Sequence, residues 1–304
     1  MFALARRRPA ALALTVVGAI YLGALAYLMR QSGASLAEPL FLLACLGVVF
    51  PLLAWACTRK PRPVPATAET AQLPGTLLYL AVFAIAVLGW GFSAVNAAFP
   101  QEPAQSVVQL AVKLATMVAL PAWLFLGLRL STRATLPPRR LLLAFVLMSL
   151  AYLAMQSVFG RGLTTLGELS PSAATLVWAI PLCWLWQTLE AGLCEEVLFR
   201  RILQEKLAIA SRSQVAAVAW ASLLFGLAHA PGLWLRGAHL MEGVAQATPA
   251  WAVAYSIVMI APAGIAFGVL WARTRSLWLI VPLHGMVDLL PQLAPFIRAW
   301  TGQA

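Results

Sequence analysis

The sequence predicts an all-α fold: a polytopic bundle of eight or nine transmembrane helices. Of the 304 residues, 62% are hydrophobic and only 10% are charged, and the mean hydropathy is +0.85. Because an average soluble domain has about 25% charged residues, a soluble core could not bury this much apolar surface. Apolar stretches of about 20 residues, the length that crosses a bilayer, recur along the chain. They are long and rich in Ala and Leu, which favours helices over the short alternating strands of a membrane barrel.

Nine segments are long and apolar enough to be candidate spans, and short polar or proline-containing breaks separate them. Each has room for the roughly 20 residues that a helix needs to cross the hydrocarbon core. Their approximate ranges are 10–29, 39–57, 75–98, 106–128, 141–159, 173–199, 215–230, 250–271 and 277–296.

The net charge of +11 could indicate a nucleic-acid ligand, but in the predicted topology most of the basic residues lie on one side of the membrane. With these spans, 16 of the 21 Lys and Arg residues lie on one side: Arg6, Arg7, Arg8, Arg59, Lys60, Arg62, Arg129, Arg133, Arg139, Arg140, Arg200, Arg201, Lys206, Arg212, Arg273 and Arg275. The positive-inside rule then predicts a cytoplasmic N-terminus and, with an odd number of spans, a C-terminus outside. We therefore expect membrane lipids around the chain and no nucleic-acid partner.

The first apolar run follows three arginines and is too long for an ordinary cleaved signal peptide, so an uncleaved signal anchor is expected. The sequence contains no organelle signal that we identify, which favours a bacterial inner membrane. The four cysteines lie in apolar spans without a CxxC spacing. They predict neither a disulfide framework nor a thiolate metal site.

The proline- and arginine-containing segment 131–140 divides the chain into two predicted parts. Residues 1–138 are expected to form accessory helices, spans one to four, in which Lys113 is almost the only ionisable residue at membrane depth. Residues 139–304 form spans five to nine and hold most of the embedded acids and histidines. A charge at membrane depth costs about 3 kcal/mol on insertion scales, so each such residue is a functional candidate.

The first candidate motif is EEVLFR, in which Arg200 follows Glu196 by four residues. An acid one turn before a base is the favoured orientation for a helical ion pair, so Glu196 and Arg200 are expected to pair. Glu195 lies about 100° around the helix and is free to face the bundle interior. There it is a candidate general base for activating water. The alternative interpretation is a pair of acids at a helix end that reach the lipid headgroups.

Two further motifs contribute histidines from later spans. In FGLAH, Phe225 and His229 share one helical face, so the ring can pack beneath the imidazole. In HGMVD, His284 and Asp288, the only aspartate in the sequence, have the same spacing, and the carboxylate can orient the imidazole or hold it charged. Either histidine alone could be an ordinary hydrogen-bonded packing residue. Three helices that bring acids and imidazoles to one apolar bundle are together typical of a catalytic site.

The order and spacing of EExxxR, FxxxH and HxxxN/D resemble the CPBP family (CAAX protease and bacteriocin-processing, or Abi), which includes the type II CAAX prenyl endopeptidases. The resemblance covers about residues 140–296. It implies that Glu195 and His229 activate a water molecule. It also implies that His284 and Asp288 stabilise the oxyanion of the tetrahedral intermediate. Many family members have Asn at the last position, and an ionised aspartate is a poorer oxyanion donor.

The resemblance gives Glu196 and Arg200 supporting roles, and Phe225 is expected to support the histidine one turn away. Family members have been described both as metalloproteases and as glutamic peptidases. A divalent ion such as zinc could be held by three residues, Glu195, His229 and His284. However, the sequence has no HExxH helix, so a metal-free mechanism is favoured and no cofactor is firmly predicted.

The predicted function is an intramembrane endopeptidase that cleaves a hydrophobic, lipidated or sorted protein near the membrane surface. Two other classes of function fit the same residues. One is a non-catalytic membrane scaffold that keeps the fold and binds a partner. The other is a proton-coupled carrier in which Glu190, Glu195 and His229 form the relay. Glu190 belongs to none of the three motifs, so it either lines the cavity or pairs with a nearby polar group.

Overall fold

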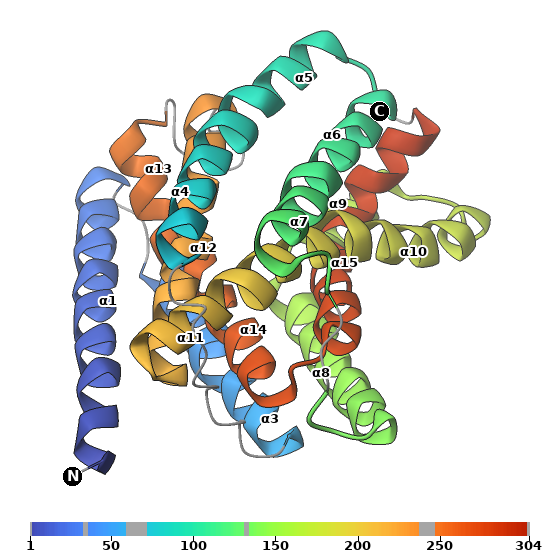
Figure 1. Ribbon diagram of the computed structural model, residues 1–304. Helices are drawn as coiled ribbons and strands as arrows, with labels where there is room; N and C mark the ends of the chain where they lie inside the picture. The colour runs from blue at the N-terminus through green and yellow to red at the C-terminus, as the bar shows by residue number, and fades with distance from the viewer. Residues whose placement is uncertain (1, 33–35, 59–71, 131–133, 237–246, 303–304) are drawn as a thin grey trace.

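The structure is a computed structural model that describes residues 2–32, 36–58, 72–130, 134–236 and 247–302. Every regular element in these ranges is helical, so the predicted all-α fold is confirmed. The helices form one bundle (Figure 1). Much of the predicted linker after the second span lies outside the described residues, as does part of the segment 131–140.

The helical elements follow one another along the chain, and several α-helices are interrupted by wider π-helical turns, labelled η. They are α1 (Phe2–Ser32), α2 (Ala37–Ala44), η1 (Cys45–Val49), α3 (Phe50–Cys57), α4 (Leu73–Phe83), η3 (Ala84–Gly91), α5 (Phe92–Ala98), α6 (Ala104–Lys113), η4 (Leu114–Ala119), α7 (Leu120–Leu126), α8 (Pro138–Phe159), α9 (Gly162–Leu169), α10 (Ala173–Gln187), η5 (Thr188–Leu193), η6 (Glu196–Gln204), α11 (Glu205–Ser211), α12 (Gln214–Arg236), α13 (Pro249–Tyr255), η7 (Ser256–Ile260), α14 (Ala261–Thr274) and α15 (Leu277–Thr301).

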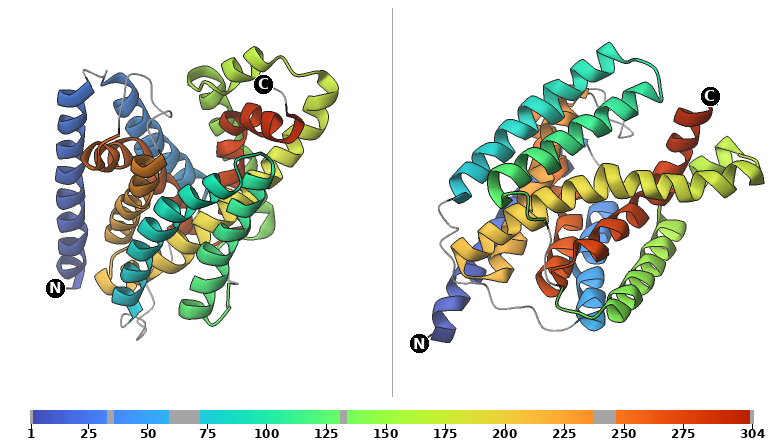
Figure 2. Two further views of the ribbon diagram at one scale, coloured as in Figure 1. Left: turned by 90° about the horizontal axis from the view of Figure 1, so that it is seen from above. Right: turned by 45° about the vertical axis from the view of Figure 1, so that its right-hand side comes forward.

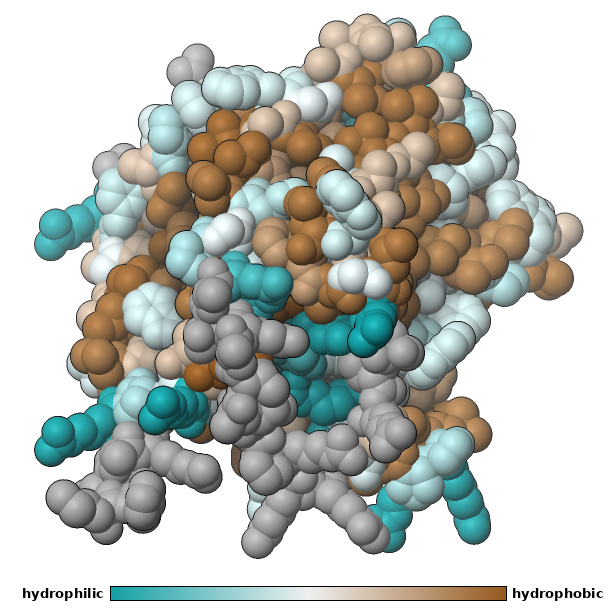
Figure 3. Space-filling view, viewed as in Figure 1, coloured by the Kyte–Doolittle hydropathy of each residue, from teal (hydrophilic) through white to brown (hydrophobic). Residues whose placement is uncertain are grey.

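Within the described residues, eight helical stretches are long and apolar enough to cross a membrane. They are Arg8–Arg30, Ala37–Cys57, Leu73–Ala98, Ala104–Leu126, Pro138–Phe159, Gln214–Arg236, Pro249–Thr274 and Leu277–Thr301. Each corresponds to one of the predicted spans, which confirms a multi-pass membrane protein. Large apolar side chains such as Trp278 and Val177 are exposed, as expected where lipid replaces water. Figure 3 shows hydrophobic residues over much of one face of the molecule.

The predicted span 173–199 differs from the other eight and is not among these stretches. Residues 173–211 instead form one continuous helical run, through α10, η5, η6 and α11. Figure 2 shows this run crossing the bundle obliquely. From Gln187 onward it contains polar and charged side chains, and most of η6 is buried among the other helices. The segment predicted as a ninth ordinary span is therefore the central helix that bears the first motif.

The N-terminal and C-terminal helices share their hydrophobic cores. Phe50 of α3 stacks on Tyr152 of α8 with ring centroids 3.8 Å apart, and Tyr152 stacks on Phe267 of α14 at 6.3 Å. A second buried cluster joins α4 to η4 with η6 and α12, including Met117 and Phe199. Helices from both halves therefore hold η6 in place. The proposed boundary between residues 138 and 139 stays a prediction.

Candidate active site

Two glycines allow the central helix and α15 to approach closely. A side chain at Gly192 of η5 would collide with the backbone oxygen of Val281, and one at Gly285 would collide with the backbone of Thr188. Bulkier residues would push the two helices apart. The close contact places His284, next to Gly285, over the two glutamates of the first motif.

Glu195 faces His229 of α12 across a short gap. The Oε1 atom of Glu195 and the Nε2 atom of His229 are 3.7 Å apart. The Nδ1 atom of His229 lies 2.8 Å from the backbone oxygen of Phe225, which can only accept, so Nδ1 carries the proton and donates it. In the neutral imidazole this leaves a lone pair on Nε2, pointing at Glu195. The Phe225 ring meets the imidazole edge-on, with centroids 5.0 Å apart.

His284 of α15 lies between three carboxylates. Its Nδ1 donates to Oε1 of Glu196 over 2.8 Å. Its Nε2 lies 3.6 Å from Oε2 of Glu195 and 3.6 Å from Oδ2 of Asp288. The ring stacks on Phe267 of α14 with centroids 4.6 Å apart. These contacts fix the orientation of the imidazole and direct Nε2 towards the same space that His229 faces.

Glu196 also contacts Arg200, the pairing that the sequence predicted. Arg200 Nε is 3.4 Å from Glu196 Oε2, and both residues are fully buried. The guanidinium lies 4.7 Å from the Phe225 ring centroid and 5.9 Å from that of Phe267. Glu196 therefore links the arginine to His284, and the two aromatic rings that support the histidines also hold Arg200.

A small polar cavity lies against Glu195 and His229. This inner cavity has a volume of about 80 Å³, and Lys113, Arg236 and Phe92 line it together with Leu88, Met117 and Phe199. A water molecule needs roughly 10–15 Å³ of such volume and at least two polar partners. The inner cavity therefore has room for several water molecules beside the Glu195 carboxylate.

A second cavity continues from the first. This outer cavity has a volume of about 500 Å³ and is lined by Asn96, Gln109 and Glu190. Three side chains, Phe92, Lys113 and Arg236, line both cavities. The shared lining shows that the outer cavity lies next to the inner cavity that contains Glu195.

Residues 176–290 match the family model of the type II CAAX prenyl endopeptidase, Rce1-like. The matched range contains all three motifs. The resemblance to the CPBP family is confirmed. The match covers less than half of the chain, and the helices before residue 176 lie outside it. Searches of the curated proteins and of the solved structures gave no match.

The structure brings together all the residues that the CPBP-family motifs predicted for the site. Glu195, His229, His284 and Asp288 face one another, and Glu196, Arg200 and Phe225 pack behind them. Glu190 lies apart from the motif residues, in an ion pair with Lys113 on the wall of the outer cavity.

Two basic residues of the cavities were not predicted as site residues. Lys113 was noted only as an embedded charge, and Arg236 lies beyond the predicted span 215–230. The signal for Lys113 was its depth in a membrane span, where an unpaired charge is costly. Arg236 gave no such signal because it is the last residue of α12.

The described residues contain no group of three or more His, Cys, Asp or Glu side chains that could hold a metal ion. Zinc binding by Glu195, His229 and His284 stays an alternative prediction.

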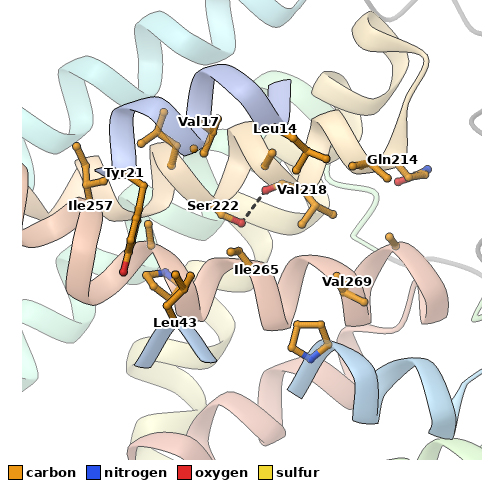
Figure 4. A pocket seen from close by; sticks show the side chains of 18 of the residues that line it. Leu14, Val17, Tyr21, Leu43, Gln214, Val218, Ser222, Ile257, Ile265 and Val269 are labelled. Carbon is orange, nitrogen blue, oxygen red and sulfur yellow. Dashed lines mark hydrogen bonds between the residues drawn. The ribbon is translucent and has the colours of Figure 1, made fainter. Parts of the chain in front are cut away.

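A third cavity lies elsewhere in the bundle. It measures about 770 Å³ between α1, α3, α12 and α14, and apolar side chains such as Val17 and Ile265 line it (Figure 4). Ser222 in its wall is about two helical turns from His229 and donates its hydroxyl hydrogen to the Val218 carbonyl over 2.6 Å. This lining provides no acid and no imidazole, unlike that of the inner cavity, which includes Glu195 and His229.

Proposed function

We propose that this protein is an intramembrane endopeptidase that hydrolyses a peptide bond in a lipidated or otherwise hydrophobic membrane-associated protein. The observation that carries the proposal is that two hydrogen-bond acceptors, His229 Nε2 and the Glu195 carboxylate, face each other at the inner cavity. The Nε2 lone pair of His229 and the carboxylate of Glu195 are 3.7 Å apart, too far for a direct hydrogen bond. A water molecule between them can donate one hydrogen to each.

The first step of the proposed reaction is attack by this water. Glu195 takes one proton while the water oxygen bonds to the carbonyl carbon of the substrate, and His229 keeps the second hydrogen oriented. The tetrahedral intermediate then collapses as the C–N bond breaks, and Glu195 returns its proton to the leaving amine. The products are a carboxylic acid and an amine, and Glu195 is again ionised.

His284 is the proposed stabiliser of the oxyanion. Its Nδ1 hydrogen is engaged by Glu196, so only a hydrogen on Nε2 can point into the reacting space. An imidazolium in this position can donate from Nε2 to the developing negative charge. Asp288, 3.6 Å from that nitrogen, orients the ring and balances its charge.

The proposed setting is a bacterial inner membrane with a cytoplasmic N-terminus. In Figure 1, α1 begins at the lower end of the bundle and α15 ends at the upper end, which supports an odd number of crossings that includes the oblique central helix. In this orientation the α5–α6 connection lies on the extracytoplasmic side of the membrane. The outer cavity, lined by Asn96 and Gln109 beside that connection, then admits substrate from the extracytoplasmic side.

The test is cleavage of an acylated, internally quenched peptide by the purified protein in liposomes. Glu195→Gln and His229→Gln should each lower kcat/KM by a factor of about 10²–10⁴, the range for general acid–base residues. Both variants should retain the melting temperature of the parent protein. Turnover close to that of the parent in either folded variant would contradict the mechanism and favour a scaffold.

The same assay decides between the metal-free and metal-dependent mechanisms. We expect a chelator to leave the rate of the purified enzyme within twofold. Loss of activity that zinc alone restores would overturn the metal-free proposal.

A further inference from the structure

Two cations border the passage between the inner and outer cavities. Lys113 of α6 and Arg236 at the end of α12 line both. Both lie beside the same ring of Phe92, with Lys113 Nζ 6.0 Å and Arg236 Cζ 5.5 Å from its centroid. Both side chains therefore border the space between the outer cavity and the cavity that contains Glu195.

The charges that line the outer cavity do not cancel. Lys113 forms an ion pair with Glu190. Arg236 has no carboxylate within ion-pair distance in the described part of the chain; its contacts there are the Leu88 carbonyl and the Phe92 ring. The outer cavity is therefore lined by two cations and one acid, Glu190, an excess of one positive charge. An unbalanced charge inside a membrane bundle is costly and indicates a function.

The backbone holds the Arg236 side chain at this point. Nη1 donates to the carbonyl oxygen of Leu88, which lies in the π-helical turn η3. Such turns interrupt the regular helical hydrogen-bond pattern and are frequent at functional sites. On the other side, a Cβ at Gly232 would lie 2.5 Å from Nη2 of Arg236, so the absent side chain provides the space for the guanidinium. An arginine has five N–H donors, and the Leu88 carbonyl engages one of them.

We propose that Arg236, with Lys113 beside it, forms a carboxylate-binding subsite that positions the substrate for cleavage. This inference rests on the proposed peptidase function and adds a specificity determinant to it. A guanidinium can bind a carboxylate with two parallel hydrogen bonds. The outer cavity, at about 500 Å³, is in the size range of sites for small ligands and can admit a short stretch of peptide. The carboxylate belongs either to a free peptide C-terminus or to an Asp or Glu side chain close to the scissile bond.

Three acylated peptides of otherwise identical sequence test the subsite in liposomes. One ends in a carboxylate, one in a carboxamide, and one in a carboxamide after a final aspartate. We expect the parent protein to cleave at least one of the two anionic peptides about 10- to 100-fold faster, in kcat/KM, than the neutral one, the range for a hydrogen bond to a charged group. Which anionic peptide is preferred identifies the source of the carboxylate.

Substitutions then assign the preference to Arg236. Arg236→Gln should reduce the ratio of anionic to neutral cleavage to about one, and Arg236→Lys should retain part of the ratio. The matched control is Arg298→Gln, because Arg298 is also in the last turn of a span but is exposed and lines none of the catalytic cavities. Equal cleavage of all three peptides by the parent, or a ratio that survives in Arg236→Gln, would overturn the subsite.

A binding measurement separates failure of the subsite from failure of the peptidase function. Non-acylated tetrapeptides, as acid and as amide, are titrated into the parent protein and Arg236→Gln in nanodiscs. If no acylated peptide is cleaved but the acid still binds at least tenfold more tightly than the amide, and only to the parent, the peptidase proposal fails and the subsite stands. Equal affinity for acid and amide, or no binding of either, contradicts the subsite.

Discussion

The inner and outer cavities adjoin each other but are built differently. Beside the inner cavity, Glu196 and Arg200 are fully buried, and Glu196 is held by both His284 and Arg200. Around the outer cavity the charged groups are partly exposed and have few partners, as in the Lys113–Glu190 pair. The comparison indicates that buried contacts hold the proposed catalytic side chains in place. The outer cavity, in contrast, can exchange water and substrate in the proposed reaction.

The largest expected effect is on stability and comes from Glu196. Glu196→Gln leaves Arg200 buried without a charged partner, which should lower the free energy of unfolding by about 3–5 kcal/mol. The glutamine oxygen can still accept from His284, so the imidazole keeps its orientation. Unfolding in detergent, followed by circular dichroism, measures the difference.

A matched substitution on the same helical run provides the control. Glu205 pairs with Arg201 at 2.9 Å and with Arg275 at 2.7 Å, but 21% of its side chain is exposed. Glu205→Gln should therefore cost about 1 kcal/mol or less. If Glu196→Gln and Glu205→Gln lowered the free energy of unfolding equally, the difference in burial between the two glutamates would not determine how much each contributes to stability.

The next effect in size concerns the oxyanion. His284→Ala should lower kcat by a factor of about 10²–10³, as the loss of one oxyanion donor does in other hydrolases. Asp288→Asn should change kcat less than tenfold, because the amide still orients the imidazole and many CPBP-family members have Asn there. A larger loss of kcat in Asp288→Asn than in His284→Ala would indicate that the Asp288 carboxylate acts in the reaction. That result would contradict the oxyanion role proposed for His284.

The sequence predicted those features of the site that depend on local spacing. The pairs Glu196–Arg200 and Phe225–His229 are each four residues apart on one helix, and the structure shows both contacts. Helical geometry alone sets such neighbours. The motif order then indicated which helices meet, and the family match supports that indication over residues 176–290.

Contacts between distant segments could not be predicted in this way. The bond between His284 and Glu196 joins residues 88 positions apart and depends on the close approach that Gly192 allows. Arg236 reaches the cavity because a π-helical turn places the Leu88 carbonyl within its range. Helix rotation, depth and turn type decide these contacts, and a pattern of residue types contains little information about them.

The smallest expected effect tests whether the outer cavity is as loosely built as its exposure indicates. The side chains of Lys113 and Glu190 are 14% and 21% exposed, so their coupling should be at most about 1 kcal/mol, or fivefold in kcat/KM. A double-mutant cycle with Lys113→Met and Glu190→Gln measures it. Glu190→Gln should also raise the preference for anionic peptides a few fold, because Lys113 is then free to assist Arg236. A coupling of 3 kcal/mol or more, or a lowered preference in Glu190→Gln, would mean that the pair is a rigid part of the catalytic structure, and the distinction between the two cavities would fail.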